Sequence, residues 1–236
     1  MCAGSPSARA VPSWWSIADL YHQSMNFDLE TSPKSHAYKL LVGLVAPRPI
    51  ALITSMNEHG HLNAAPFSAY NYLCTDPPIL GIGVTNKSGD GFVPKDTARN
   101  IRRTGEFVVN VVTEDIAQQM NICATDFPPE VSELEMAAFT TAPSLKIKVP
   151  RIAEAHAALE CVEYTTMEIG RSRIILGRVV AMYVEDRYVD PEGPYIKADE
   201  LHSIGRMNGL GNYVRTRDAF ISIPRISYAE WKNGKR

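Results

Sequence analysis

The chain has 236 residues, and 45% of them are hydrophobic, so it can bury a substantial core without disulfides or metals. We expect one large domain with terminal extensions. Its 24 Lys and Arg residues against 26 Asp and Glu give a net charge of −2, which argues against a basic surface for nucleic acid or for an anionic membrane. We therefore predict no nucleic-acid partner and no membrane partner.

The four cysteines are far apart and form no C-x-x-C pair, which argues against a zinc site or a redox dithiol. The first residues lack the apolar run of a signal peptide, and no stretch of ~18 apolar residues is present to span a membrane. We expect a cytoplasmic, reducing setting, isolated buried thiols and no metal site.

The N-terminal region divides into two predicted parts. Residues 1–12 are rich in Ser, Ala, Gly and Pro and are typical of a flexible tail, whereas residues 13–37 are predicted to be a helical extension with Ser13 as its cap. From 38 to 55 the sequence YKLLVGLVAPRPIALITS is apolar and rich in β-forming residues. Its two prolines favour a strand edge, a bulge or a bend rather than a central position in a sheet.

Strands and short helices follow. A turn at Gly60 leads into FSAYNYL and then ILGIGVT, and three strands in succession predict an antiparallel meander. PKDTARNIRRTG predicts a short helix that ends at Gly105, EFVVNVV predicts a strand, and TEDIAQQMNICA predicts a second helix with Thr113 as its cap.

Residues 124–150 are Pro-rich and irregular, and such a segment usually covers a site or makes a subunit contact. A strand pair is predicted around Gly170, and the domain ends near residue 224, leaving a C-terminal tail at 225–236. Strands outnumber helices and there is no βαβ alternation. The sequence therefore favours a mainly β, Greek-key-like antiparallel barrel with inserted helices over a doubly wound fold.

The segment PKDTARN carries the most informative polar side chains. Lys95, Asp96, Thr97 and Asn100 lie around the first turn of the predicted helix, where free N–H groups already favour an anion. Thr97 and Asn100 are three residues apart, so they share one helix face and can reach one phosphate. The alternative is that Asp96 or Thr97 only caps the helix and that Lys95 is solvated.

Two other segments support a phosphate-containing ligand. NAAPFS at 63–68 is a strand entry built from small residues, where a planar ligand can approach the backbone and accept hydrogen bonds from its amides; a tightly packed hairpin is the alternative. RPIALITS at 48–55 ends in two hydroxyl residues that can bind a ribityl chain or a phosphate, although such residues commonly form turns.

Other kinds of site are poorly supported. No nucleophile elbow of the G-x-S-x-G type is present, and we assign no catalytic side chain. Gly81 and Gly83 are followed by Asn86 where a dinucleotide fingerprint needs its third glycine, so a Rossmann domain is disfavoured. His59 and His61 belong to a predicted exposed turn, which favours solvated side chains over a metal site.

Taken together, the segments resemble the flavin reductase-like proteins, FMN-binding split barrels that include flavoredoxin and the reductase components of two-component monooxygenases. The resemblance covers residues ~38–224 and rests on seven segments in the family's order. These are VAPRPIALITS, GHLNAAPFS, DPPIL, KDTARNI, GEFVVNVV, ALEC and IGRMNGLGNY.

The resemblance implies a six-stranded split barrel that forms a homodimer, with FMN near the subunit interface and its phosphate at the Lys95 turn. It also implies that backbone at 65–68 meets the isoalloxazine and that two hydroxyls flank the phosphate. The implied cofactor-binding residues are Arg48, Thr54, Ser55, Ala65, Pro66, Phe67, Ser68, Thr85, Lys87, Lys95, Asp96, Thr97, Asn100 and Arg206.

The function implied by the resemblance is a flavin reductase that transfers hydride from NADH or NADPH to flavin N5, with a monooxygenase or another electron acceptor as a partner. No acid or base side chain is required for that step. Two alternatives stay open: a flavoprotein electron carrier that does not turn over nicotinamide, and an FMN-dependent tailoring enzyme acting on an organic substrate.

Overall fold

The computed structural model describes residues 25–87, 92–128, 131–217, 220–221, 223 and 225–233. The chain divides into two compact units, Met1–Leu41 and Val42–Arg236. The predicted tail at 1–12 and the start of the predicted N-terminal helix at Ser13 lie outside the described residues. The site and its scaffold belong to the second unit.

Helix α2 (Lys34–Leu44) replaces the first part of the strand predicted at 38–55. It begins directly after Pro33, and proline is well suited to the start of a helix because its fixed φ matches and its missing N–H is not needed there. None of its residues is buried. An apolar run was mistaken for a strand here, and the strand begins only after the two prolines.

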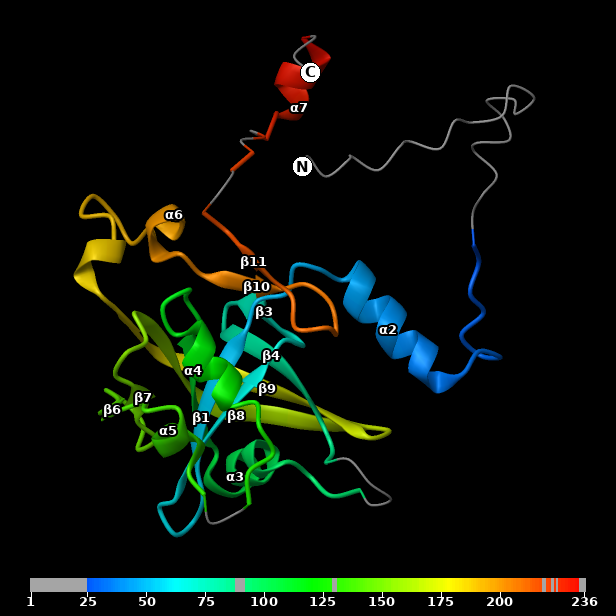
Figure 1. Ribbon diagram of the computed structural model, residues 1–236. Coiled ribbons are helices and arrows are strands. Elements are labelled where there is room, and N and C mark those ends of the chain that lie inside the picture. Colours follow the sequence, from blue (N-terminus) through cyan, green and yellow to red (C-terminus); the bar gives the residue numbers. More distant parts are fainter. Residues whose placement is uncertain are drawn as a thin grey trace, which may run out of the picture. The chain divides into compact units, whose positions relative to one another are not determined.

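A seven-stranded antiparallel sheet forms the body of the second unit (Figure 1). Its strands pair in the order β2-β1-β5-β8-β9-β4-β3. The structure is mainly β with inserted helices, as predicted. The strands are β1 (Ala51–Met56), β2 (Leu62–Phe67), β3 (Tyr70–Thr75), β4 (Pro78–Thr85), β5 (Glu106–Val111), β8 (Ala157–Ile169) and β9 (Ser172–Val184).

The predicted meander is wrong, because β2 and β3 stand at opposite ends of the strand order. Only two residues separate the end of β2 at Phe67 from the start of β3 at Tyr70. A sheet whose first and last strands are joined by so short a link must curve back on itself, as a barrel does. Both of these aromatic side chains pack into one apolar core.

Two hairpins agree with the sequence prediction. The β1–β2 hairpin turns at Gly60, whose φ of 85° lies in the left-handed region that glycine enters without steric cost. The β8–β9 hairpin turns at Gly170, and its two long strands pair from Ala157 opposite Val184 to Ile169 opposite Ser172. The predicted strand pair around Gly170 is confirmed.

The helices inserted between the strands are short. Helix α3 (Asp96–Thr104) ends at Gly105, as predicted, and α4 (Ala117–Ile122) follows β5. The predicted cap of α4 is wrong: Ile116 holds the N-cap position, and the Thr113 hydroxyl instead donates to the Asp115 carboxylate.

The remaining elements are small. Helix α5 (Glu133–Met136) lies within the Pro-rich segment, where the Ser132 hydroxyl accepts from the backbone N–H of Glu135 at its start. Two two-stranded sheets and three further short helices complete the described chain. They are β6 (Thr141–Ala142) with β7 (Arg151–Ile152), β10 (Ile204–Arg206) with β11 (Tyr213–Arg215), η1 (Asp186–Tyr188), α6 (Ala198–Leu201) and α7 (Tyr228–Lys232).

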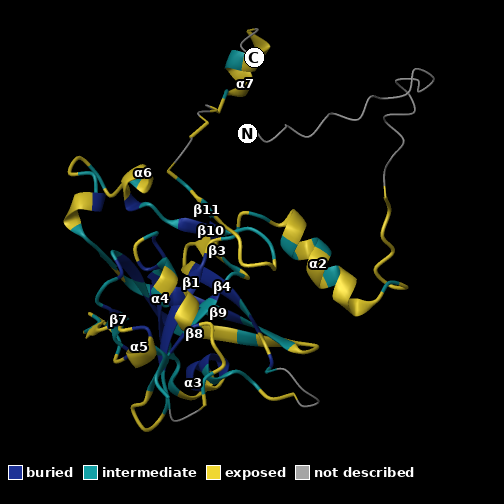
Figure 2. Ribbon diagram, viewed as in Figure 1, coloured by how far each residue is buried: buried dark blue, intermediate teal, exposed yellow. Residues whose placement is uncertain are grey.

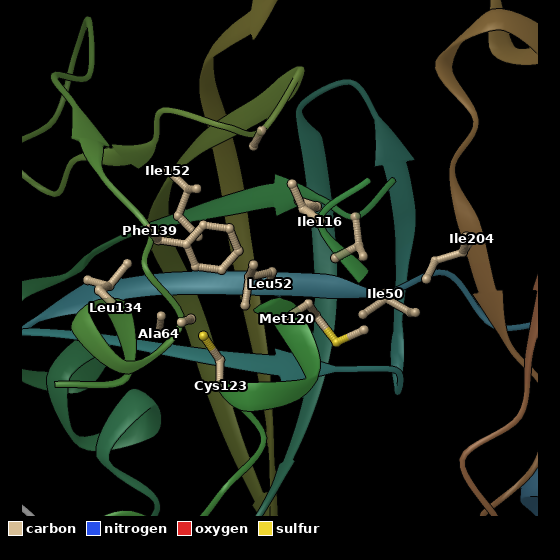
Figure 3. Close-up of a cluster of buried hydrophobic side chains, with 13 residues drawn as sticks. Ile50, Leu52, Ala64, Ile116, Met120, Cys123, Leu134, Phe139, Ile152 and Ile204 are labelled. Atoms are coloured by element: carbon tan, nitrogen blue, oxygen red, sulfur yellow. The ribbon is translucent and has the colours of Figure 1, made fainter. Parts of the chain in front are cut away.

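Two apolar cores meet at β1, which is buried over nearly its whole length (Figure 2). Leu52 faces the first core, which receives side chains from α4 and α5, and Ile53 faces the second, beneath α3. Figure 3 shows the first core gathered around β1. Since neighbouring residues of a strand point to opposite faces, β1 contributes side chains to both cores. The helices that pack on these cores, α3, α4 and α5, all contact β2, the neighbour of β1 in the sheet.

The cysteines agree only in part with the prediction of isolated buried thiols. Cys74, Cys123 and Cys161 are free, but only the last two are buried, and Cys74 is exposed on β3.

Candidate functional site

The start of α3 has no side-chain cap. Lys95 occupies the N-cap position with extended backbone, and its side chain makes no capping hydrogen bond. The first N–H groups of a helix lack partners within the helix, so they remain directed at whatever lies before it. The alternative in which Asp96 or Thr97 caps the helix is not what the structure shows.

Thr97 is held in place by β2. Its side chain is buried, and its Oγ1 accepts a hydrogen bond from the Asn63 amide at 3.0 Å. Ala98 and Ile101 on the same helix are buried in the second core, which sets the rotation of α3. Strand β2 and the first turn of α3 are therefore fixed together.

A cavity of about 410 Å³ opens beside this junction. Cofactor and small-molecule sites generally have volumes of ~300–1,000 Å³, so the cavity is large enough for a ligand of that class. Its walls come from β2, the start of α3, the segment just after β4, and the Pro-rich segment. The lining residues are Asn63, Ala65, Pro66, Phe67, Lys87, Lys95, Asp96, Thr97, Cys123, Ala124, Thr125, Asp126, Phe127 and Glu133.

The charged groups of the cavity are unequally paired. The Asp96 carboxylate accepts from Lys87 Nζ at 2.8 Å and also from the Arg99 guanidinium. Lys95 forms no ion pair among the residues that the structure describes. A lysine beside an uncapped helix start carries positive charge where the helix dipole is also positive, which favours an anion at this point.

The edge of β2 offers few backbone donors to a ligand. Pro66 has no N–H, and the Ala64 N–H already donates to Glu133 Oε2 at 3.4 Å. A planar ligand along this strand therefore meets an apolar surface from Ala65 to Phe67 more than a row of amides. The prediction that backbone amides at 63–68 bind such a ligand therefore loses two of its possible donors, the N–H groups at positions 64 and 66.

Two titratable groups on the cavity wall are shifted by burial. Burial raises the pKa of the Glu133 carboxyl, and the nearby Asp96 carboxylate acts in the same direction. Burial likewise raises the pKa of the Cys123 thiol to about 12, so this sulfur stays protonated and is a poor nucleophile near neutral pH.

The model of the flavin reductase like domain family matches residues 44–202, more than half of the chain. The chain belongs to this family. A structure of 2-nitrobenzoate 2-nitroreductase NbaA from Pseudomonas fluorescens is 39% identical, with a TM-score of 0.76 over 85% of this chain and 96% of that one. Nitrilotriacetate monooxygenase component B from Bacillus cereus is 33% identical, with a TM-score of 0.78 over 84% and 98%.

The split-barrel fold of this flavin reductase-like chain is confirmed by a third structure. A putative flavin reductase with a split barrel domain from Shewanella frigidimarina has a TM-score of 0.73 over 86% of this chain and the whole of that one, at 19% identity. Seven strands, rather than the six expected, make up the main sheet. The family and its flavin-binding relatives support a flavin cofactor.

The cavity fits the phosphate end of a flavin. It combines a lysine without an ion pair among the described residues, an uncapped start of a nine-residue helix and a fixed threonine hydroxyl. These are the donor types that hold phosphate in proteins, and the adjoining apolar strand offers a surface for a ring system. Of the predicted cofactor residues, seven line this cavity: Ala65, Pro66, Phe67, Lys87, Lys95, Asp96 and Thr97.

Three predicted residues are buried in the protein interior and do not line the cavity. The Asn100 amide donates to Ser55 Oγ at 3.3 Å, and both side chains are buried. Thr54 points to the other side of β1, where its hydroxyl donates to the Pro150 carbonyl at 2.8 Å. These groups brace α3 and β1, and none of the three lines the cavity.

The other predicted residues lie elsewhere. The Arg48 guanidinium donates to three backbone carbonyls and to Ser68 Oγ at 3.4 Å, beside a separate cavity of about 360 Å³. Arg206 donates to the Asn208 carbonyl and to the Tyr213 hydroxyl, and Thr85 is the exposed last residue of β4.

Sequence reasoning did not assign the far wall of the cavity. Glu133 and Cys123–Phe127 come from the C-terminal end of α4 and from the Pro-rich segment. The available signal was the irregular segment at 124–150, for which covering a site was one of two open alternatives. Its first residues line the cavity. Asn63, in the segment NAAPFS, is not among the predicted binding residues, yet its amide positions Thr97.

No helix among the described residues is long and apolar enough to cross a membrane. In the same part of the chain, no group of three or more His, Cys, Asp or Glu side chains is arranged to hold a metal ion.

Proposed function

We propose that the chain is an NAD(P)H-dependent flavin reductase that binds FMN in the cavity between β2 and the start of α3. The observation that carries this proposal is Lys95: it lies at an uncapped helix start, beside an apolar strand, in a chain of the flavin reductase-like family. In this arrangement Lys95 and the first N–H groups of α3 bind the phosphate, and Thr97 adds a hydroxyl held by Asn63.

The protein contributes binding and orientation. When bound, a flavin would supply the redox chemistry of hydride transfer from a nicotinamide. Residues Ala65, Pro66 and Phe67 support the ring system, and residues 123–127 shield the cavity from the opposite side. Because the sequence has no dinucleotide fingerprint, we infer that the nicotinamide would reach the flavin without a separate Rossmann domain, and NADH and NADPH are equally open as donors.

We also propose a homodimer with a separate electron-accepting partner. The exposed side chains of Tyr72 and Leu73 on the edge strand β3 support a subunit contact. The relation to a monooxygenase component B supports a monooxygenase partner. Light scattering in solution tests the dimer; a monomer at micromolar concentration would contradict it. The cytoplasmic setting stays a prediction.

One spectroscopic experiment tests the central proposal. The purified protein is reconstituted with FMN, separated from free flavin, and titrated without oxygen with NADH and, separately, with NADPH. We expect at least one nucleotide to bleach the flavin absorbance with a stoichiometry of one. Bound flavin that neither nucleotide reduces would remove the reductase assignment and leave the electron-carrier alternative, with chemical reduction as the positive control.

A second candidate function is direct reduction of an organic substrate. The 39% identity to a 2-nitrobenzoate 2-nitroreductase over most of both chains favours it specifically. The test mixes the reduced protein with 2-nitrobenzoate without oxygen. Reoxidation of the bound flavin faster than with benzoate, which has the same charge but no nitro group, would favour this function over supply of reduced flavin to a partner.

A further inference from the structure

Glu133 places a carboxyl group in the same cavity as the proposed phosphate site. It is the first residue of α5, and the next residue, Leu134, is buried in the first core. This anchoring fixes the start of the helix against β2, where Glu133 Oε2 accepts from the Ala64 N–H at 3.4 Å. The carboxyl group is therefore held at the cavity wall by packing on one side and by the strand on the other.

The positive charge near Glu133 is shared with other carboxylates, although the nearby Lys87 acts to lower the pKa of Glu133. From the segment after β4, Lys87 pairs with Asp96 at 2.8 Å, and from α3 the Arg99 guanidinium pairs with the same carboxylate. Lys95 is the remaining cation of the cavity lining, whereas the linker before α5 adds Asp126. The Cys123 thiol is neutral near pH 7, and β2 presents no charged side chain to the cavity.

A phosphate dianion bound in this cavity would add negative charge next to the existing carboxylates. In the free protein Lys87, Lys95 and the neighbouring Arg99 match the carboxylates of Asp96, Asp126 and Glu133 in number, and the helix start adds only a partial positive charge. The two charges of the phosphate therefore leave the site with excess negative charge. Like charges in one poorly solvated site favour protonation of the group that is most easily neutralised. Glu133 is that group, because burial already raises its pKa in the free protein, whereas Asp96 is paired twice.

We propose that Glu133 takes up a proton when the phosphate of FMN binds, so that this residue makes FMN affinity depend on pH and selects against the phosphate at high pH. The inference rests on the proposed function, because it assumes the phosphate site at Lys95. It goes beyond that function by assigning the proton-linked residue. A flavin without a phosphate should bind without proton uptake by Glu133.

The pH dependence has a distinctive sign. Between the pKa of Glu133 in the free protein and its higher pKa in the complex, the Kd of FMN rises with pH, by up to about tenfold per pH unit. The second ionisation of the phosphate, near pH ~6, acts oppositely, because the dianion binds Lys95 more tightly. A Kd that increases above neutral pH therefore reports Glu133 and not the ligand.

The experiment measures binding to the full chain freed of flavin, at pH values from ~5 to ~9, where carboxyl groups with raised pKa titrate. FMN and riboflavin are compared on the wild type, on Glu133→Gln and on Glu135→Gln. In Glu133→Gln the new amide oxygen can still accept from the Ala64 N–H, and Glu135 is an exposed control on the same helix. Calorimetry in two buffers of different ionisation heat counts the protons taken up.

We expect wild type and Glu135→Gln to take up protons with FMN and to bind it more weakly as the pH rises. Glu133→Gln should bind FMN more tightly than wild type at high pH, with a flat profile there, and riboflavin should show no such slope. Identical FMN profiles for Glu133→Gln and wild type would overturn the inference, as would an equal slope for riboflavin. Failure of FMN to bind at any pH would instead remove the proposed function.

Discussion

The cavity at Lys95 and the cluster around His156 both contain charged side chains. The central side chain is bonded to carboxylates in the cluster, whereas it has no ion pair among the described residues in the cavity. Both ring nitrogens of His156 are bonded, Nε2 to Asp115 Oδ2 and Nδ1 to Glu185 Oε1, each at 2.7 Å. Its ring packs against Tyr188, with centroids 5.2 Å apart. Lys95, in contrast, has no ion pair within the described part of the chain.

Cavity size and charge pairing rank the two regions differently. The cavity beside His156 measures about 710 Å³, against about 410 Å³ at Lys95. In the larger cavity, however, the side chains of His156 and Asp115 make their hydrogen bonds within the protein, as is typical of a structural cluster. Among the described residues, the smaller one contains a lysine without an ion pair and a helix start without a side-chain cap, an arrangement that favours an anion.

The largest effect that sharpens this comparison is expected from Lys95→Ala. Removing one charged hydrogen-bond donor to phosphate costs about 1.5–3 kcal/mol, so FMN should bind ~10- to 150-fold more weakly. The free energy of unfolding without flavin should change by less than ~0.5 kcal/mol, because no ion pair or capping bond is lost. Fluorescence titration and urea unfolding measure the two quantities. Lys146→Ala, at an exposed position, is the control, and equal FMN affinity in both variants would contradict the phosphate role.

Sequence reasoning found the near side of the site because its signals are local. Lys95 and Thr97 stand at the start of a helix whose proline, polar first turn and terminal Gly105 are adjacent in sequence. Glu133 approaches β2 from about seventy residues downstream, bonding Ala64 through the packing of α5. No local pattern encodes that approach.

The family resemblance did not indicate which of the matching side chains line the same cavity. Arg48 and Arg206 match the family segments, yet their guanidinium groups bond backbone carbonyls and Tyr213 rather than the cavity at Lys95. Likewise, an apolar run predicted a strand at 38–44, where the chain forms α2, because strand and helix share apolar composition and differ only in periodicity. The sheet order needed long-range pairing that no turn signal near β3 reveals.

His156→Ala tests the second of the two regions, the cluster around His156, and its main effect should be on the free energy of unfolding. Losing hydrogen bonds to two carboxylates should lower the free energy of unfolding by about 1–2 kcal/mol at neutral pH. FMN affinity should stay within twofold of wild type, because the cluster does not line the cavity at Lys95. Urea unfolding and FMN titration measure the two effects, with His61→Ala at an exposed turn as control. A loss of FMN affinity matching that of Lys95→Ala would erase the distinction between the two regions.

The smallest expected effect is the acid dependence of the same cluster. Burial acts to raise the pKa values of Asp115 and Glu185, but hydrogen bonds and the charge of His156 more than offset it, so both pKa values lie below their usual range. A carboxyl group with a lowered pKa in the folded state stabilises the fold above its unfolded pKa and loses that contribution as the pH falls through the folded value. The stability difference between wild type and His156→Ala should therefore shrink below about pH 4, by ~0.5–1 kcal/mol because water screens the exposed part of the pair. Urea unfolding at a series of falling acid pH values measures this difference. A difference that stays constant over the whole acid range in which the protein is folded would show that His156 stabilises the fold by packing on Tyr188 alone.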